Sequence, residues 1–263
     1  DLIEKILPEI TKLISNENAD IKLALCLSVP SIASVVVKVP EALNQIKNAI
    51  GLLAKDPNPD VKARLLLNIE PYLKTLASSS INNQFAGIIY ELLADKNWKI
   101  RVQGIKALEQ FVIKFPEDFA QDDRVMKVFN DKLTDRIANV RKSALKSLKT
   151  IAQSQGAAWT EKNLLPIIHA YVDHPNYLYR YNFLYEIGEV VLVLAQPTQL
   201  RETEIILKLT KDAVANIRFK ALLTLLKIAQ RSDDKGNEER LRRAADALIA
   251  DPDNEVKRFA KNI

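Results

Sequence analysis

The sequence predicts an all-α protein in which one helix pair is repeated along the chain. Three observations lead to this fold class. Hydrophobic residues make up 48% of the 263 residues, whereas aromatic residues make up only 6%. The chain has 6 glycines, so aliphatic side chains must fill the core, as they do between packed helices. The third observation is a short motif that recurs at a nearly constant interval, which indicates a stacked array of similar units.

The recurring motif is an acidic residue, five further residues, and a basic residue preceded by an aliphatic one. Its basic residue occupies the following positions: Lys22, Lys62, Arg101, Arg141, Arg180, Arg218 and Lys257. The successive intervals are 40, 39, 40, 39, 38 and 39 residues. An interval of about 40 residues is typical of HEAT repeats and longer than the tetratricopeptide or ankyrin period. We therefore predict a HEAT-repeat α-solenoid, a right-handed superhelix of antiparallel helix pairs.

The residues after each basic residue follow the period of an amphipathic helix. Offsets of 3, 4, 7, 10 and 11 residues are apolar in each of the first six repeats. In the fourth repeat these positions hold Ala144, Leu145, Leu148, Ile151 and Ala152. A second apolar-periodic segment lies upstream of the motif, for example over residues 3–14. Each repeat is therefore predicted to be a helix, a turn and a second helix.

We expect a single array over residues 1–263. Its approximate repeats are 1–38, 39–78, 79–116, 117–156, 157–196, 197–234 and 235–263, the last one truncated. Turn sequences with proline at residues 56–59, 174–176 and 251–253 place the motif at the turn and at the start of the second helix. The motifs then line one edge of the stack. There the acid of one turn can pair with the base of an adjacent turn and accept free turn amides, in a ladder that His174 interrupts. Each pair, if exposed, should contribute about 0.2–1 kcal/mol.

The sequence lacks the signatures of an enzyme. It has no glycine-rich phosphate loop and no Gly-x-Ser-x-Gly motif. Because His169 and His174 are the only histidines and Cys26 is the only cysteine, we expect no metal site and no other cofactor. Cys26 lies at an apolar offset of its helix, where a buried and unreactive thiol is expected.

Composition also bears on the cellular setting. No apolar run approaches the roughly 18 residues that span a bilayer, so no membrane partner is expected. Because enzyme motifs are missing, no small-molecule substrate is expected either. A single cysteine fits a reducing compartment, so the chain is predicted to be cytoplasmic or nuclear. The net charge of +5 comes from interspersed residues of both signs, whereas nucleic-acid binders usually concentrate their positive charge.

Departures from the repeat at its turns are the candidate interaction sites. Three residues before the basic residue, Trp98 and Tyr177 stand where three other repeats have alanine. Large aromatic residues at an exposed turn are typical interface anchors, although each could instead fold onto the neighbouring turn. Lys96, Lys99 and Arg101 lie around Trp98 in the sequence and make this edge basic, which suits an acidic or mixed-charge protein surface. Nucleic acid is disfavoured because the aromatic residues are too few and too widely spaced to stack successive bases.

Three turns resemble one particular family. Residues 95–101 (DKNWKIR) are similar to the turn of the eleventh repeat of the scaffolding A subunit of protein phosphatase 2A. Residues 174–180 (HPNYLYR) resemble its thirteenth repeat and residues 212–219 (DAVANIRF) its fourteenth. The resemblance covers essentially the whole chain as the last seven of fifteen repeats, so we expect a portion of a longer chain. One family feature is absent, because Ala138 stands where the twelfth repeat usually has tyrosine.

The resemblance implies a non-catalytic scaffold of a Ser/Thr protein phosphatase 2A-like holoenzyme. Its later repeats would bind the phosphatase catalytic subunit through their turns, and its earlier repeats would hold a regulatory B-type subunit. The candidate partner-binding residues are Trp98, Lys99, Arg101, Tyr177, Arg180, Asn216 and Arg218. The alternative is a generic HEAT adaptor in transport or chromatin, which would bind acidic protein segments or nucleic acid through the basic edge. Steep salt dependence of DNA binding would favour that alternative.

Overall fold

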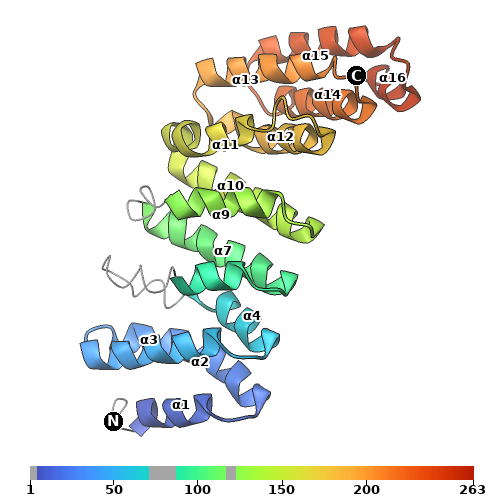
Figure 1. Ribbon diagram of the computed structural model, residues 1–263. Coiled ribbons are helices and arrows are strands. Elements are labelled where there is room, and N and C mark those ends of the chain that lie inside the picture. Colours follow the sequence, from blue (N-terminus) through green and yellow to red (C-terminus); the bar gives the residue numbers. More distant parts are fainter. Residues whose placement is uncertain (1–4, 71–86, 117–122) are drawn as a thin grey trace. The chain divides into compact units, whose positions relative to one another are not determined.

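The computed structural model describes residues 5–70, 87–116 and 123–263, which form helices joined by short turns (Figure 1). No strand occurs among these residues, and the all-α prediction is confirmed. The predicted repeat boundaries at 78/79 and 116/117 involve residues outside the described ranges. The chain divides into two compact units, Asp1–Ser147 and Leu148–Ile263, and the division falls within one helix, α10.

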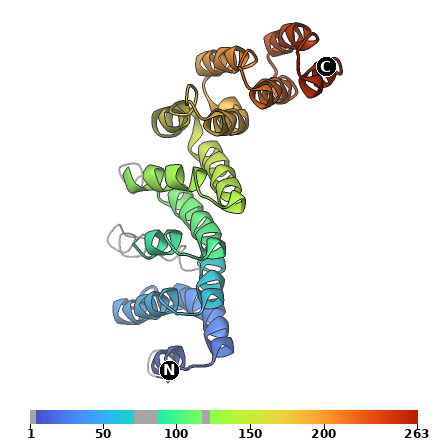
Figure 2. The ribbon, with the colours of Figure 1, turned by 45° about the vertical axis from the view of Figure 1, so that its right-hand side comes forward.

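The first unit is a stack of helix pairs. Its helices are α1 (Leu7–Ile14), α2 (Ala19–Val36), α3 (Pro40–Ala54), α4 (Pro59–Leu67), α7 (Trp98–Lys114), α9 (Asp123–Leu133) and the beginning of α10 (Ala138–Trp159). The second helices of successive repeats, α2, α4 and α7, pack on one another along one side of this unit (Figures 1 and 2). Each buries its apolar stripe, for example Ile105, Leu108 and Phe111 of α7, which are fully buried. This packing follows the apolar offsets of the sequence.

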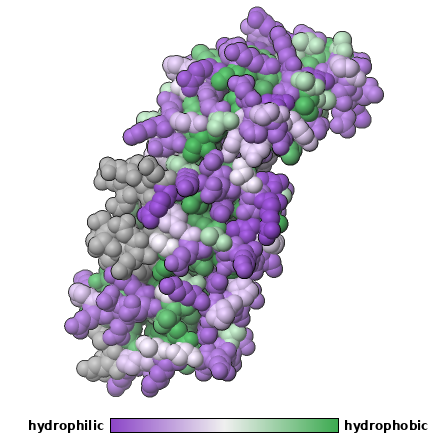
Figure 3. Space-filling view, in the orientation of Figure 1, coloured by the Kyte–Doolittle hydropathy of each residue, from purple (hydrophilic) through white to green (hydrophobic). Residues whose placement is uncertain are grey.

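The second unit repeats the same plan. It contains the π-helix η2 (Thr160–Leu164), α11 (Leu165–His169), α12 (Tyr177–Val190), the 3-10 helix η3 (Val191–Val193), α13 (Gln196–Leu209), α14 (Ala215–Ala229), α15 (Lys235–Leu248) and α16 (Asn254–Ala260). Helix α14 packs on α12 and on α16, and its partner within the repeat is α13. Phe183, Leu184 and Ile187 of α12 and Leu222 of α14 are completely buried. The visible surface mixes hydrophilic and apolar side chains (Figure 3).

Helix α10 consists of two helical segments that meet at Gly156. The φ of 80° and ψ of −173° at this residue are not helical. Glycine adopts a positive φ without the steric cost that a Cβ atom imposes. Gly156 therefore separates the second helix of one repeat from the segment that continues into η2 and α11.

Helix α2 has a composition that the sequence analysis underrated. It is 18 residues long with a mean hydropathy of 1.6, so by length and composition alone it could cross a membrane. The expectation that no apolar run approaches this length is wrong for α2. Cys26, Val29 and Ala33 of this helix are fully buried, and α2 packs against α3 and α4. Only 33% of this helix is buried, however, and Leu27 and Val35 on it are 49% and 69% exposed, so its place in the helix stack accounts for part of its apolar composition.

Candidate protein-binding edge

The turns that carry the repeated motif are linked by a ladder of ion pairs. The basic residue of one turn reaches the aspartate of the following turn, with N–O distances of 2.7–2.8 Å. The pairs are Lys22–Asp56, Lys62–Asp95, Arg101–Asp135, Arg180–Asp212 and Arg218–Asp251. The predicted ladder is confirmed at these turns. Its direction is constant, because each base pairs with the acid of the next turn.

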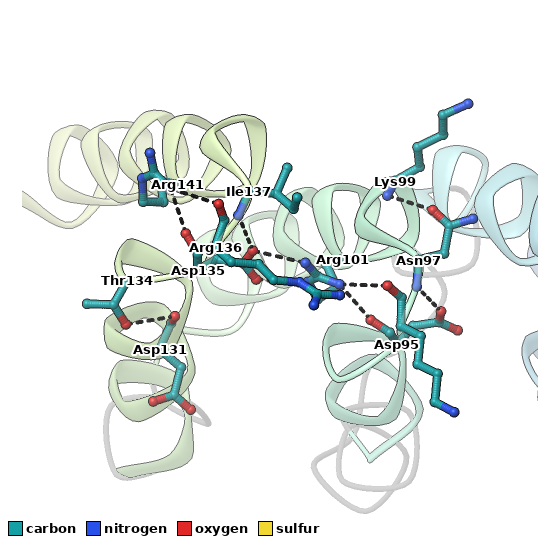
Figure 4. Close-up of polar contacts among 11 residues, drawn as sticks. Asp95, Asn97, Lys99, Arg101, Asp131, Thr134, Asp135, Arg136, Ile137 and Arg141 are labelled. Carbon is teal, nitrogen blue, oxygen red and sulfur yellow. Dashed lines mark hydrogen bonds and ion pairs between the residues drawn. The ribbon is translucent and has the colours of Figure 1, made fainter.

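Each ladder residue also holds its own turn together, as the turn of α7 illustrates (Figure 4). Arg101 donates to both carboxylate oxygens of Asp135, and its Nη1 also donates to the carbonyls of Asp95 and Lys96 at 2.9 and 3.1 Å. Asp135 in turn accepts the N–H of Ile137 at 2.9 Å. The carboxylate therefore satisfies a turn amide that has no partner inside the helix.

Asparagine side chains begin several of the second helices. Asn97 accepts the N–H of Lys99 at 3.0 Å, and its own N–H donates to Asp95 Oδ1 at 2.7 Å. The same capping bond is made by Asn18, Asn58, Asn97 and Asn176. Sequence reasoning missed these caps, although asparagine four residues before the basic residue was a visible signal.

The ladder pairs are much less exposed than the sequence analysis assumed. The side chains of Arg101 and Asp135 are 8% and 9% exposed. Burial raises the pKa of Asp135. Hydrogen bonds from Arg101 and from the Ile137 N–H, with the positive charge of Arg101, outweigh that effect and bring this pKa below its ordinary value. The estimate for exposed pairs does not apply here, since breaking one side of a buried pair costs several kcal/mol.

The fifth repeat keeps the turn without the carboxylate. His174 Nδ1 accepts the N–H of Asn176 at 3.1 Å, the bond that an aspartate oxygen makes in the ladder turns. Its ring stacks on Tyr179 with centroids 3.9 Å apart. In the turn before it, Arg141 donates to the carbonyls of Asp135 and Arg136. Three ladder pairs thus lie in the first unit and two in the second, among the described residues.

The predicted contact residues of the first unit differ in accessibility. Trp98 is the first residue of α7 and is partly exposed, and Lys99 beside it is exposed. Arg101 is only 6% exposed, because its guanidinium group lies in the ladder. Lys96 and Arg136 are exposed on the same turns. The accessible part of these turns therefore includes one tryptophan and three cationic side chains.

The predicted residues of the second unit show the same division. Tyr177 begins α12 and is 38% exposed, and Asn216 near the start of α14 is exposed. Arg180 and Arg218 pair with ladder aspartates. Leu178, which the sequence analysis did not select, is 52% exposed beside Tyr177. We call the accessible residues of these turns the turn edge: Trp98 and Lys99 in the first unit, and Tyr177, Leu178 and Asn216 in the second.

The environment of Cys26 and the placement of the potential metal ligands bear on the expected lack of catalytic and metal sites. Cys26 is fully buried, its thiol lies 3.4 Å from the Val61 carbonyl oxygen, and burial raises its pKa to about 12. The prediction of an unreactive thiol is consistent with this environment. Within the described ranges, no group of three His, Cys, Asp or Glu side chains is placed to hold a metal ion.

Glu186 on α12 is a buried acid that the sequence analysis did not single out. It is 2% exposed, and neither carboxylate oxygen has a hydrogen-bond partner in the described part of the chain. Burial raises its pKa to about 8. Its position, six residues after Arg180, holds serine, asparagine, alanine, threonine or isoleucine in the other repeats, and that contrast was a visible signal.

Comparison with known proteins identifies the repeat class. Residues 94–162 match the family model SCD, the Stromalin conservative domain. No curated protein sequence matches the chain. A chain in the structure of Kap95p with RanGDP superposes with a TM-score of 0.72 at 14% identity, over 97% of this chain and 34% of that one. A chain from the crystal structure of Kap121p bound to Pho4p gives 0.67 at 15% identity, over 98% and 29%. The MAST/Orbit N-terminal domain gives 0.54 at 17% identity, over 81% and 94%.

At such low identity these likenesses show the fold alone. They agree with the repeat period and with the stacked helix pairs, so the chain is a HEAT-repeat solenoid. It spans about a third of the length of the Kap95p and Kap121p chains that it matches. The similarities show the HEAT-repeat fold and do not single out the phosphatase 2A scaffold.

Proposed function

We propose that this chain is a non-catalytic HEAT scaffold that binds acidic or mixed-charge protein segments through the turn edge. The observation that carries the proposal is that some turn residues are buried in ion pairs while others on the same turns stay accessible. The ladder holds the buried arginines, while Trp98, Lys99 and Tyr177 remain accessible on turns fixed by hydrogen bonds. Preorganised aromatic anchors beside cations are typical of protein-binding surfaces.

The comparisons favour a general adaptor over a specialised one. Kap95p is described with RanGDP and Kap121p with Pho4p, so both similar structures involve protein partners. The match to the Stromalin conservative domain also spans Trp98, Lys99 and the turn at Asp135. Under this proposal the chain acts in the cytoplasm or nucleus as an adaptor for transport or chromatin.

A specific observation supports a second candidate. The three turn sequences over residues 95–101, 174–180 and 212–219 resemble those of the phosphatase 2A scaffold. In that case the turn edge would bind a phosphatase catalytic subunit, which would supply the chemistry. A regulatory B-type subunit would then occupy the earlier repeats.

The test measures binding of three purified probes by the whole chain. The probes are an Asp/Glu-rich peptide of 20 residues, a Ser/Thr phosphatase catalytic subunit, and a DNA duplex. The adaptor proposal expects the peptide to bind and to weaken when Trp98 or Tyr177 is replaced by alanine. Truncating an interface aromatic commonly costs about 2 kcal/mol, or roughly 30-fold in affinity. Ala19→Ser, a turn substitution outside the turn edge, is the control and should change nothing.

The outcomes separate the candidates. The second candidate would be established if the phosphatase subunit binds tightly, both aromatic substitutions weaken that binding, and the peptide does not bind. DNA binding with a log–log salt slope of several units would favour nucleic acid. If either aromatic substitution speeds hydrogen exchange of its helix and leaves binding per folded molecule intact, the residue packs the core and the turn edge is wrongly assigned.

A further inference from the structure

Helix α12 carries a row of exposed tyrosines that leads away from the turn edge. Tyr177, Tyr181 and Tyr185 are spaced four residues apart and are 38%, 37% and 36% exposed. Residues at this spacing lie on one face of a helix. At a rise of 1.5 Å per residue the row spans roughly 12 Å, or about two turns. We call these three residues the tyrosine ridge.

One lysine from the next repeat lies over this ridge. Lys220 of α14 places its Nζ 4.5 Å from the centroid of the Tyr185 ring and 5.5 Å from that of Tyr181. These are cation–π distances, so the two rings hold the ammonium group in place. Among the described residues, Lys220 forms no ion pair with a carboxylate. The ridge thus presents a positioned cation that can accept an ion pair from a partner.

A hollow adjoins the ridge between α12 and α14. Its volume is about 360 Å³, and its lining includes Tyr185, Gly188, Lys220, Leu223 and Lys227. Leu223 is 36% exposed there. Gly188 presents no side chain to the hollow, so backbone forms part of its wall. Glu189 and Gln230 also line the hollow, so its wall mixes apolar, aromatic and charged groups, and a space of this size accepts one or two side chains of a partner.

The charges around the hollow limit what can bind. Glu189 on α12 is bonded to Lys149 at 2.8 Å and also to Lys227, so these two lysines are already neutralised in part. Lys220 makes no ion pair in the described part of the chain, and the carboxylate of Glu189 lines the same hollow. A polyanion such as nucleic acid would meet one free cation and one acid, which is poor complementarity. A surface with one carboxylate and several apolar side chains fits better.

We propose that the tyrosine ridge and its hollow bind an amphipathic helix of a partner protein. The apolar face of that helix would lie along the three tyrosines and Leu223, and one of its aspartates or glutamates would pair with Lys220. The ridge length matches two turns of a helix, whose apolar residues recur at intervals of three and four. This inference rests on the proposed scaffold function and adds a second surface, on the second helices and separate from Trp98 and Lys99.

The test uses a display library of 16-residue helical peptides with randomised apolar and charged positions. The library is selected on the wild-type chain and counter-selected on the Tyr181→Ala, Tyr185→Ala double variant. We expect the enriched peptides to carry apolar residues at i, i+4 and i+7 and one acidic residue on the same face. Their affinity should fall at least about tenfold with Tyr185→Ala or Lys220→Glu, since buried aromatic and charge contacts dominate such interfaces.

A charge exchange makes the test independent of folding. Changing the acidic residue of a selected peptide to lysine should weaken binding to the wild type and restore it to the Lys220→Glu chain. Leu52→Ala, which truncates an exposed apolar residue of α3 in the first unit, is the matched control and should leave affinity unchanged. Melting curves of each variant report whether the helices remain folded.

Three results would overturn the inference. The first is that selected peptides bind the double variant as well as the wild type. The second is that the enriched peptides show no acidic residue or no rescue by charge exchange. The third is that single-stranded DNA binds and depends on Tyr185. Because Trp98 and Lys99 are unchanged in these variants, failure of the ridge leaves peptide binding at the turn edge intact and is thus distinguishable from failure of the proposed function.

Discussion

Replacing Asp212 with asparagine should destabilise the second unit through the ladder. Asp212 accepts Arg180 Nε and Nη2 at 2.8 and 2.9 Å, and it also accepts the Val214 N–H at 2.8 Å. Asparagine has nearly the same shape and keeps one acceptor oxygen. It loses the negative charge, however, and its amide donors face the donors of Arg180. The substitution therefore tests the charge pair without removing side-chain volume.

The expected magnitude follows from the burial of the pair. The side chains of Arg180 and Asp212 are 14% and 9% exposed. Breaking one side of a fully buried pair costs about 3–5 kcal/mol, and an exposed pair contributes about 0–1 kcal/mol. Arg180 retains its bonds to the carbonyls of His174 and Pro175, which moderate the loss. We expect a loss of about 2 kcal/mol, or roughly 30-fold in the opening equilibrium.

Hydrogen exchange is the suitable measurement, because long repeat arrays often unfold in parts and a single melting temperature is then ill-defined. Amides of α12 and α14 should exchange faster by the factor given above. Glu239→Gln removes an exposed pair with Arg243, whose side chains are 65% and 76% exposed, and should change exchange by less than about 0.5 kcal/mol. If Asp212→Asn has as small an effect as this control, the ladder does not stabilise the stack as argued.

Two further outcomes follow from the same contacts. Asp135 and Asp212 have folded-state pKa values below the ordinary one. Burial raises these pKa values, but the hydrogen bonds and the positive charge of the paired arginines lower them by more. The stability that these two carboxylates contribute is therefore present above the unfolded-state pKa of about 3.9 and is lost as the pH falls through the folded-state pKa. Acid titration of helicity should show unfolding below about pH 4. Unchanged stability from about pH 6 to about pH 2 would contradict this expectation. Gly188→Ala should cost about 1–3 kcal/mol in chemical denaturation, because the new Cβ would lie 2.9 Å from Thr224 Cγ2. Gly51→Ala, which has no neighbour within 4 Å, should be neutral or stabilising, and equal losses at both glycines would refute the steric argument.

The helix pairs could be predicted because the same packing problem recurs in every repeat. Apolar residues at fixed offsets identify the buried face, and aspartate six residues before the base identifies the turn. The direction of the ladder could not be predicted in the same way. The base of one turn lies a similar distance along the stack from the acids before and after it, so the rotation between repeats decides which acid it meets. Only the structure shows that Lys22 pairs with Asp56 and Arg101 with Asp135.

Burial at the helix–helix contacts was less predictable. The position six residues after the base is exposed in Ser28 and half-buried in Asn68, but it is buried in Ala107, Ser147 and Thr224. The environment at this offset depends on how closely each second helix approaches its neighbour. A single sequence does not reveal that approach. The burial of Glu186 therefore could not be predicted from its offset alone.

Tyr177 distinguishes the two proposed surfaces because it belongs to both of them. It stands at the turn edge, corresponding to Trp98, and it is also the first residue of the tyrosine ridge. Trp98→Ala should therefore weaken only ligands of the turn edge, and Tyr185→Ala only a helix on the ridge. Tyr177→Ala should weaken both classes of ligand. If Tyr177→Ala weakens only one class of ligand, Tyr177 belongs to only one of the two surfaces. The other surface must then be defined without this residue.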